Sequence, residues 1–214
     1  MTWTHADWGA AVREARRAHP PGWDALRGSS RRPIHPLRVC AALQPVIDAG
    51  ATLVCDGGEF GQWVQAGVEA PTRLINGLSG SIGSAIPMAI GARLARPDRP
   101  VVAALGDGTF GFHAFELDTV ARHRAPVVAL VGNDARWNAE HQLQLQHYGA
   151  DRAVGCELRP TRYDEVARAL GGHGELVERP EDLEPALGAG GPACVNVTID
   201  GVAAPTYRAA PGAH

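Results

Sequence analysis

Short apolar runs alternate with segments of helically spaced apolar residues along most of the chain. The runs are rich in β-branched residues and predict strands, whereas apolar residues three and four positions apart predict the helices between them. The runs are too continuous for half-exposed strands, so the pattern predicts an α/β fold, a doubly wound parallel sheet with helices on both faces. The expected strands are 52–55, 73–75, 101–105, 127–131, 175–178 and 194–199.

The two ends of the chain depart from this pattern. The first 33 residues combine a short amphipathic helical pattern with Pro, Gly, Ser and Arg, which predicts an arm or linker. The last residues are rich in Pro and Ala and have little reason to fold alone. We therefore predict an N-terminal arm (1–33), one domain (34–202) and a C-terminal tail (203–214).

Composition narrows the class of protein. With 214 residues, 45% of them hydrophobic, the chain can form a sizeable core, and a net charge of -3 with scattered basic residues gives no reason to expect nucleic acid or an anionic membrane as partner. The first residues form no apolar stretch and no run of eighteen apolar residues occurs, so we expect neither secretion nor a membrane span. Its four cysteines form no CxxC pair, which predicts free thiols and a cytoplasmic location.

Asp107 stands between Gly106 and Gly108 at the end of an expected strand. Ligands of parallel sheets bind beyond the carboxyl ends of the strands, and glycines there let the backbone approach an anion closely. We expect the next helix to begin around 112–114 and to offer its free N–H groups to a phosphate. A carboxylate beside a phosphate is favourable if a divalent cation such as Mg²⁺ lies between them.

A second polar pair, Asn133-Asp134, ends the next expected strand. Neighbouring parallel strands would bring it close to Asp107, so both carboxylates could bind one metal ion, with a backbone carbonyl from the following loop. Phosphate oxygens and water would complete the shell. The alternative is that both motifs are ordinary strand-end turns with solvated carboxylates.

Three separated blocks, "VCDGGEF", "GLSGSIG" and "GDG…ND", occur in an order that resembles a known family. It is the C-terminal, diphosphate-binding domain of thiamine-diphosphate-dependent enzymes of the acetolactate synthase, benzaldehyde lyase and 2-hydroxyacyl-CoA lyase group. The resemblance covers about residues 31–202. It implies the cofactors thiamine diphosphate and Mg²⁺.

The resemblance also implies site residues. The metal ligands would be Asp107, Asp134 and the main-chain carbonyl of Arg136; the family usually has Asn at the second position, and Mg²⁺ also accepts a carboxylate there. Cofactor activation would involve the Gly80 carbonyl, which meets the aminopyrimidine, and Ile82, which wedges the cofactor into a bent form; the alternative for Ile82 is a core residue at a helix start. The remaining cofactor-binding positions are Gly58, Glu59, Ser81, Gly106, Gly108, Thr109, Trp137 and Asn138.

The sequence leaves two interpretations open for several other residues. His113 could line the substrate cavity or simply begin a helix, and Gln62 and Trp63 could face the thiazolium or pack within a loop. The glycines of "GLSGSIG" are spaced GxxGxxG, and the acid expected about twenty residues on to bind a ribose is not in a convincing place, so a nicotinamide-dinucleotide site is a weak alternative. The spacing of "EHQLQLQH" would not direct Glu140 and its two histidines at one zinc ion.

The reaction and partner follow only from the resemblance. It implies a C–C bond cleaved or formed next to a carbonyl, as in a 2-oxo acid decarboxylase, an acetolactate-synthase-like carboligase or a 2-hydroxyacyl lyase, with the cofactor as electron sink. The family's catalytic glutamate lies in a separate pyrimidine-binding domain. We therefore expect one subunit of a split enzyme, completed by a partner chain in a heterotetramer; a piece of a longer enzyme is one alternative. A non-catalytic regulatory subunit with the same fold is another.

Overall fold

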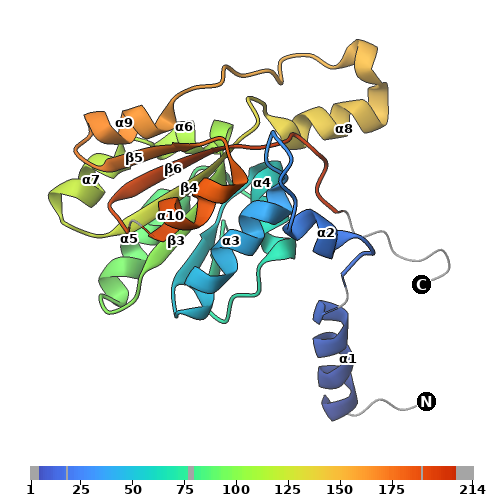
Figure 1. Cartoon of the computed structure of the whole chain (residues 1–214), viewed down its shortest axis with the longest axis horizontal. Helices are drawn as coiled ribbons and strands as arrows, with labels where there is room; N and C mark the ends of the chain where they lie inside the picture. Colours follow the sequence, from blue (N-terminus) through green and yellow to red (C-terminus); the bar gives the residue numbers. More distant parts are fainter. Residues whose placement is uncertain (1–4, 18, 77–79, 189, 206–214) are drawn as a thin grey trace.

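A single parallel sheet forms the centre of the molecule (Figure 1). The computed structural model describes residues 5–17, 19–76, 80–188 and 190–205. The strand order is β2-β1-β3-β4-β6-β5, and every pairing is parallel. The predicted fold class is confirmed, and each strand end lies within two residues of its expected position. The strands are β1 (Thr52–Cys55), β2 (Arg73–Ile75), β3 (Val101–Gly106), β4 (Val127–Asn133), β5 (His173–Val177) and β6 (Ala193–Thr198).

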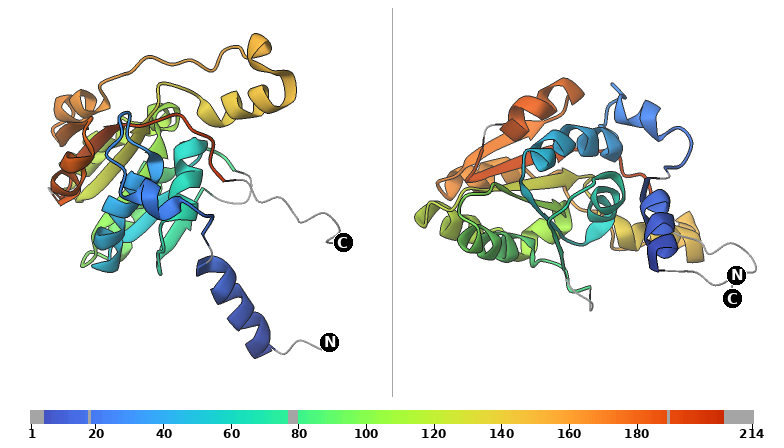
Figure 2. Two further views of the ribbon diagram at one scale, coloured as in Figure 1. Left: turned by 45° about the vertical axis from the view of Figure 1, so that its right-hand side comes forward. Right: turned by 90° about the horizontal axis from the view of Figure 1, so that it is seen from below.

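Both faces of the sheet are covered because successive side chains of a strand point to opposite faces. In β3, Val102 and Ala104 pack into one core layer, whereas Val101, Ala103 and Leu105 pack into the other. The first layer lies under α3 (Pro36–Asp48), α4 (Gly58–Gly67) and α10 (Leu183–Gly188). The second lies under α5 (Ala85–Ala95), α6 (Asp107–His113), α7 (Glu116–Arg122) and α9 (Tyr163–Ala169), as Figure 2 shows from two sides.

The chain changes direction across the sheet between β1 and β3. After β1 it runs outward to the edge strand β2, and then returns through α5 to β3 on the other side of β1. Such a reversal opens a crevice beyond the carboxyl ends of β1 and β3, where ligands of doubly wound folds bind. The fold therefore places the loops after β1 and β3 side by side at this crevice.

The expected start of the helix that follows β3 is wrong. The helix after β3 begins at Asp107, with Gly106 in an extended conformation before it, and not at 112–114. Glycines at 108 and 111 disfavour a helix on propensity alone. Tertiary packing overrides that preference, because Phe110 of α6 is buried in the core.

The predicted arm contains two helices. The first, α1 (His5–Arg17), stands apart from the sheet in Figures 1 and 2. The second, α2 (Trp23–Arg27), packs on the domain: Trp23 is buried beside Trp63, and the Arg27 guanidinium donates to the Gly67 carbonyl at 2.8 Å. Of the predicted tail, 206–214 lies outside the described residues.

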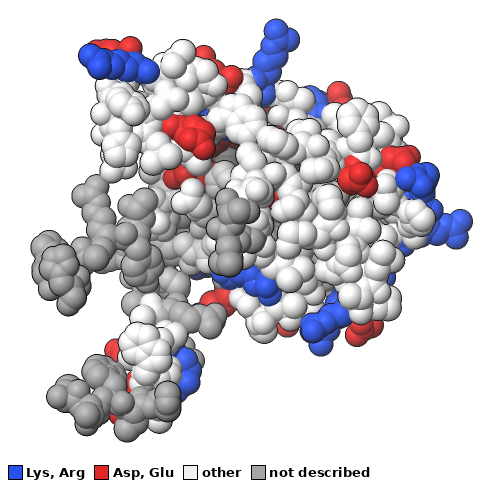
Figure 3. All heavy atoms as spheres, turned by 180° about the vertical axis from the view of Figure 1, so that it is seen from behind, with Lys and Arg blue, Asp and Glu red and all other residues white. Residues whose placement is uncertain are grey.

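Helix α8 (Asn138–Tyr148) extends beyond the sheet, and residues 149–162, with the 3₁₀ turn Ala150–Arg152, return from its far end to α9 (Figure 1). A second 3₁₀ turn, Pro180–Asp182, precedes α10. On the face drawn in Figure 3, Arg side chains stand apart and alternate with acidic ones. Within the described ranges, no helix has the length and apolar character needed to cross a bilayer.

Candidate functional site

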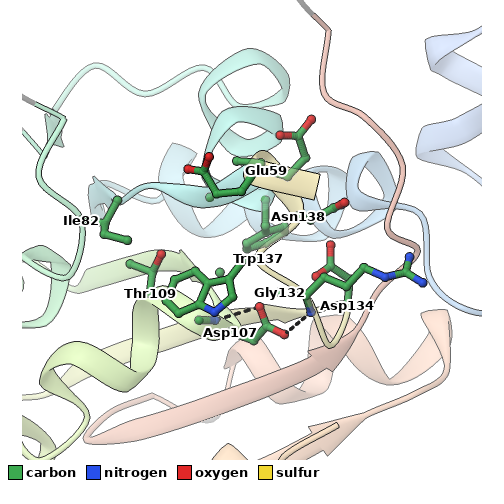
Figure 4. A pocket seen from close by; sticks show the side chains of 15 residues that line it. Glu59, Ile82, Asp107, Thr109, Gly132, Asp134, Trp137 and Asn138 are labelled. Carbon is green, nitrogen blue, oxygen red and sulfur yellow. Dashed lines mark hydrogen bonds between the residues drawn. The ribbon is translucent and has the colours of Figure 1, made fainter. Parts of the chain in front are cut away.

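A pocket with about 430 Å³ of empty space opens at the carboxyl ends of β1, β3 and β4. In Figure 4, Glu59 and Ile82 border one side of it and Asp107 and Asp134 the other, with Trp137 between them. Four chain segments, after β1, before α5, after β3 and at the end of β4, therefore meet at the crevice. The lining residues are Gly58, Glu59, Phe60, Ile82, Gly106, Asp107, Gly108, Thr109, Gly132, Asp134, Arg136, Trp137, Asn138, Ala139 and Glu140.

Asp107 is held rigidly at the base of this pocket. One of its carboxylate oxygens accepts the N–H of Gly108 at 2.8 Å, and the other accepts the N–H of Arg136 at 3.1 Å (Figure 4). Burial raises the pKa of Asp107 to about 6, although the backbone N–H groups favour its charged form. The bond to Arg136 ties the loop after β3 to the loop after β4.

Asp134 shares this poorly solvated region with Asp107. Its pKa is raised to about 7, first by burial and then by the negative charge of Asp107. Burial and mutual repulsion disfavour the charged forms of these two carboxylates, and a divalent cation bound between them would stabilise those forms. Among the described residues no group of three His, Cys, Asp or Glu side chains is placed to hold a metal ion. The pocket thus supplies two carboxylates, which suits Mg²⁺ because that ion typically takes its other ligands from phosphate and water.

A buried donor in the pocket wall is also incompletely bonded. Asn138 is 3% exposed, and among the described residues its side-chain nitrogen makes no full hydrogen bond, although it lies close enough to Asp134 to favour the charged form of that carboxylate. Its amide oxygen accepts from Gln142 at 3.1 Å. Because an incompletely bonded buried donor is costly, an anionic oxygen in the pocket would satisfy it.

The floor of the pocket consists of backbone, and at Gly108 the Trp137 indole covers it. A Cβ on Gly108 would come within 2.6 Å of the Trp137 ring, so only glycine allows this approach. Gly58 has φ +85, a left-handed conformation that favours glycine, and it lies beside Gly106 and Thr109. Gly58 and Gly106 line the pocket without side chains, which leaves room for a ligand carrying phosphate to approach the backbone.

Ile82 projects from the loop before α5. It is 36% exposed and lines the pocket, so the alternative of a core residue at a helix start is wrong. A Cβ on Gly57 would lie 2.2 Å from Ile82 Cγ2, which means that the isoleucine fills the space beside Gly57. Gly80, with φ +65, and Ser81 precede it in the same loop but do not line the pocket.

Glu59 closes the pocket from the side of α4. It is 8% exposed, and its carboxylate accepts from the Ala204 N–H and, at 3.3 Å, from the Gln62 amide. Burial raises the pKa of Glu59. The bond to Ala204 brings the described end of the predicted tail against the site.

The family model for the C-terminal TPP binding domain of thiamine pyrophosphate enzymes matches residues 56–197, a span that contains every residue of this pocket. The chain belongs to the thiamine pyrophosphate enzyme family. Thiamine pyrophosphate is thiamine diphosphate under its other name, so the resemblance read from the three sequence blocks is confirmed.

Curated relatives of this thiamine pyrophosphate-binding domain carry several names. The chain is 45% identical over 178 residues to the acetolactate synthase large subunit IlvG of Mycobacterium tuberculosis, and this match covers 79% of the chain and 32% of the relative. It is 34% identical over 184 residues to 2-hydroxyacyl-CoA lyase 2 of Bos taurus (83% and 28%), and 34% identical over 157 residues to sulfoacetaldehyde acetyltransferase of Alcaligenes xylosoxydans (72% and 26%). The chain therefore spans about a third or less of these relatives.

Three residues for which the sequence left two interpretations do not line the pocket of the thiamine pyrophosphate-binding domain. Trp63 is buried, donates to the Val202 carbonyl at 3.1 Å and packs edge-on against His35, so it does not face the cavity. Gln62 is exposed on α4. His113 ends α6 rather than beginning a helix, and its Nδ1–H donates to the Gly83 carbonyl at 2.7 Å.

Sequence reasoning missed four residues that line the pocket, Phe60, Gly132, Ala139 and Glu140. The Phe60 ring fills the space that a Cβ on Gly132 would occupy, at 2.2 Å. The apolar spacing of α4 shows that Phe60 is buried, but it does not show that a glycine on β4 faces it. Such pairing depends on the tertiary fold of the thiamine pyrophosphate-binding domain.

A buried polar network supports the loop that carries Asp134. Asn133 accepts the N–H of Ala135 at 3.2 Å and donates to Asn196 of β6 at 3.1 Å, and Asn196 donates to Asp164 at 3.3 Å. Asp164 is fully buried and forms an ion pair with Arg162 at 2.6 Å. Because these partners are themselves bonded, the network holds the end of β4 in one place.

Asp134→Asn should change how the stability of the metal-free chain depends on pH. The folded-state pKa of Asp134, about 7, lies above its ordinary value of 3.8, so the stability that this group contributes falls as the pH rises between these values. Asn does not titrate. The difference in Tm between variant and wild type should therefore be more positive at pH 8 than at pH 4, measured calorimetrically with a chelator. Equal differences at both pH values, or the same trend in the exposed control Asp118→Asn, would contradict this.

Proposed function

We propose that the chain binds the diphosphate of thiamine diphosphate through Mg²⁺ and forms half of the active site of an enzyme that cleaves or forms C–C bonds next to a carbonyl. The observation that carries the proposal is the pairing of Asp107 and Asp134 in one pocket at the strand-order reversal. Membership of the thiamine pyrophosphate enzyme family supports the identity of the cofactor. The names of the relatives favour 2-oxo or 2-hydroxyacyl compounds as substrates.

In this proposal each wall of the pocket has its own task. Asp107, Asp134 and the main-chain carbonyl of Arg136 hold Mg²⁺, while Asn138 and the start of α6 at Gly106 and Thr109 receive phosphate oxygens. Ile82 and the Gly80 carbonyl orient the organic part of the cofactor. The bound cofactor supplies the electron sink for the C–C bond change. The chain positions that group, excludes water beneath it and neutralises the charge of its diphosphate.

A second polypeptide with a pyrimidine-binding domain would complete the site. Ile82, which lines the pocket, is 36% exposed, and Phe112, whose ring packs edge-on against Trp137, is 55% exposed. Phe115, directly before α7, is 78% exposed. Large apolar side chains grouped on a surface are typical of the core of a protein interface. The resemblance implies that the catalytic glutamate comes from that domain, and two chains of each kind would give a heterotetramer.

Titration calorimetry tests cofactor binding directly. We expect thiamine diphosphate to bind in the presence of Mg²⁺ and to lose affinity when EDTA removes the metal, because the phosphate charge would then face two carboxylates. NAD should give no heat of binding. Metal-independent binding of thiamine diphosphate, or binding of NAD instead, would refute the proposed cofactor.

Asp134→Asn is expected to keep Mg²⁺-dependent binding. An amide oxygen is also a hard ligand for Mg²⁺, and the change removes repulsion from Asp107. The affinity for thiamine diphosphate with Mg²⁺ should stay within about tenfold of wild type, which corresponds to about 1.4 kcal/mol. A larger loss in the same titration would mean that the second carboxylate charge is required.

A further inference from the structure

Asp56 follows β1 directly and lies beneath the loop that carries Ile82. Its side chain is fully buried. Its carboxylate accepts the backbone N–H groups of Gly57 at 2.7 Å, Gly83 at 3.1 Å and Ala85 at 2.7 Å. One side chain therefore joins the end of β1 to the loop and to the first residue of α5.

These bonds replace the local cap that the sequence would suggest for α5. Ser84 stands at the N-cap position, but its side chain makes no capping bond, and its buried hydroxyl has no partner among the described residues. Asp56 reaches the start of α5 from the end of β1 and accepts N–H groups that would otherwise be free at an uncapped helix start. Its negative charge also complements the positive end of the helix dipole.

The same loop is held from two other directions. The Gly83 carbonyl accepts from His113 of α6 at 2.7 Å, so both sides of this residue are bonded to neighbouring elements. Gly83 has φ +99, where a side chain would be strained. Its neighbour Ile82 packs onto Gly57, whose own N–H is bonded to Asp56. The position of Ile82 is thus set by bonds that converge on the Asp56 carboxylate.

We infer that Asp56 is a positioning residue for Ile82, and through it for the organic part of thiamine diphosphate; this inference rests on the proposed function. The diphosphate half depends on a different wall, where Asp107 bonds to Gly108 and Arg136. A change at Asp56 should therefore weaken the binding of thiamine diphosphate and leave the binding of inorganic diphosphate with Mg²⁺ intact. A general loss of structure would weaken both.

The test is Asp56→Asn in the full chain. Asn replaces one acceptor oxygen with a donor group, which leaves one of the three N–H groups without an acceptor. Calorimetry with Mg²⁺ should show about tenfold weaker binding of thiamine diphosphate and a change within about twofold for inorganic diphosphate. Ser84→Ala, in the same loop, is the matched control and should bind both ligands as wild type does.

Amide hydrogen exchange of the unliganded wild type supplies a measurement that needs no variant. The N–H groups of Gly83 and Ala85 should be protected, although N–H groups at a helix start usually exchange fast. Fast exchange at both would overturn the inference, as would Asp56→Asn that binds thiamine diphosphate normally or weakens both ligands equally. Failure of the wild type to bind thiamine diphosphate would refute the proposed function instead, and exchange would still decide the role of Asp56.

Discussion

Asp107→Ala should abolish Mg²⁺-dependent binding of diphosphate, with a loss of at least about a hundredfold, or about 2.7 kcal/mol. The substitution removes the carboxylate closest to the backbone floor and leaves the N–H groups of Gly108 and Arg136 without their acceptor. The two loops that this carboxylate joins would separate as well. Calorimetric titration of inorganic diphosphate and of thiamine diphosphate, each with Mg²⁺, measures the effect.

Two comparisons make this result interpretable. Asp107→Asn keeps one acceptor oxygen and should preserve the fold, so a strong loss of binding in that variant separates the role of charge from that of structure. Asp118→Ala removes an exposed carboxylate on α7 that pairs with Arg122 and should have no effect on either ligand. Unchanged diphosphate affinity in Asp107→Ala would exclude the proposed metal site.

The second large effect concerns activity. The isolated chain should show no turnover of 2-oxo acids, because the proposed catalytic glutamate belongs to a pyrimidine-binding domain. Activity should appear on mixing with a polypeptide that carries such a domain, and should be lost when its glutamate is replaced by Gln. Light scattering after size-exclusion chromatography should detect an assembly of two chains of each kind.

A surface variant distinguishes assembly from cofactor binding. Phe115 is 78% exposed and does not line the pocket, so Phe115→Ser should leave Mg²⁺-dependent diphosphate binding unchanged. It should weaken assembly and reduce the activity of the mixture in proportion. Turnover of a 2-oxo acid by the chain alone would refute the requirement for a partner.

Periodicity was sufficient to predict the central strands because both of their faces are buried. Continuous apolar runs such as Val101–Gly106 arise only where neither side of a strand meets water. The site could be anticipated for a related reason: polar residues that directly follow such strands converge at one edge. Asp107 and Asp134 satisfy this condition, and the structure places both in one pocket.

The remaining features depend on contacts that no local pattern encodes. The start of α6 at Asp107 follows from the burial of Phe110 and from the fit of Gly108 under Trp137, both of which outweigh the poor helix propensity of glycine. Asp56 could be seen only as an acid after a strand, since its partners Gly83 and Ala85 lie 27 and 29 residues away. Long-range capping of this kind becomes visible only when the chain is folded.

Helix α8 connects the pocket to a remote, exposed surface. Its first residue, Asn138, lines the site, whereas its last, Tyr148, is 65% exposed beyond the edge of the sheet. With a rise of about 1.5 Å per residue the helix is about 16 Å long, so a tilt of about 10° at the pocket displaces its far end by about 3 Å. The loop before it is bonded to Asp107 through Arg136. Any change in the tilt of α8 at the pocket would therefore be larger at this remote surface.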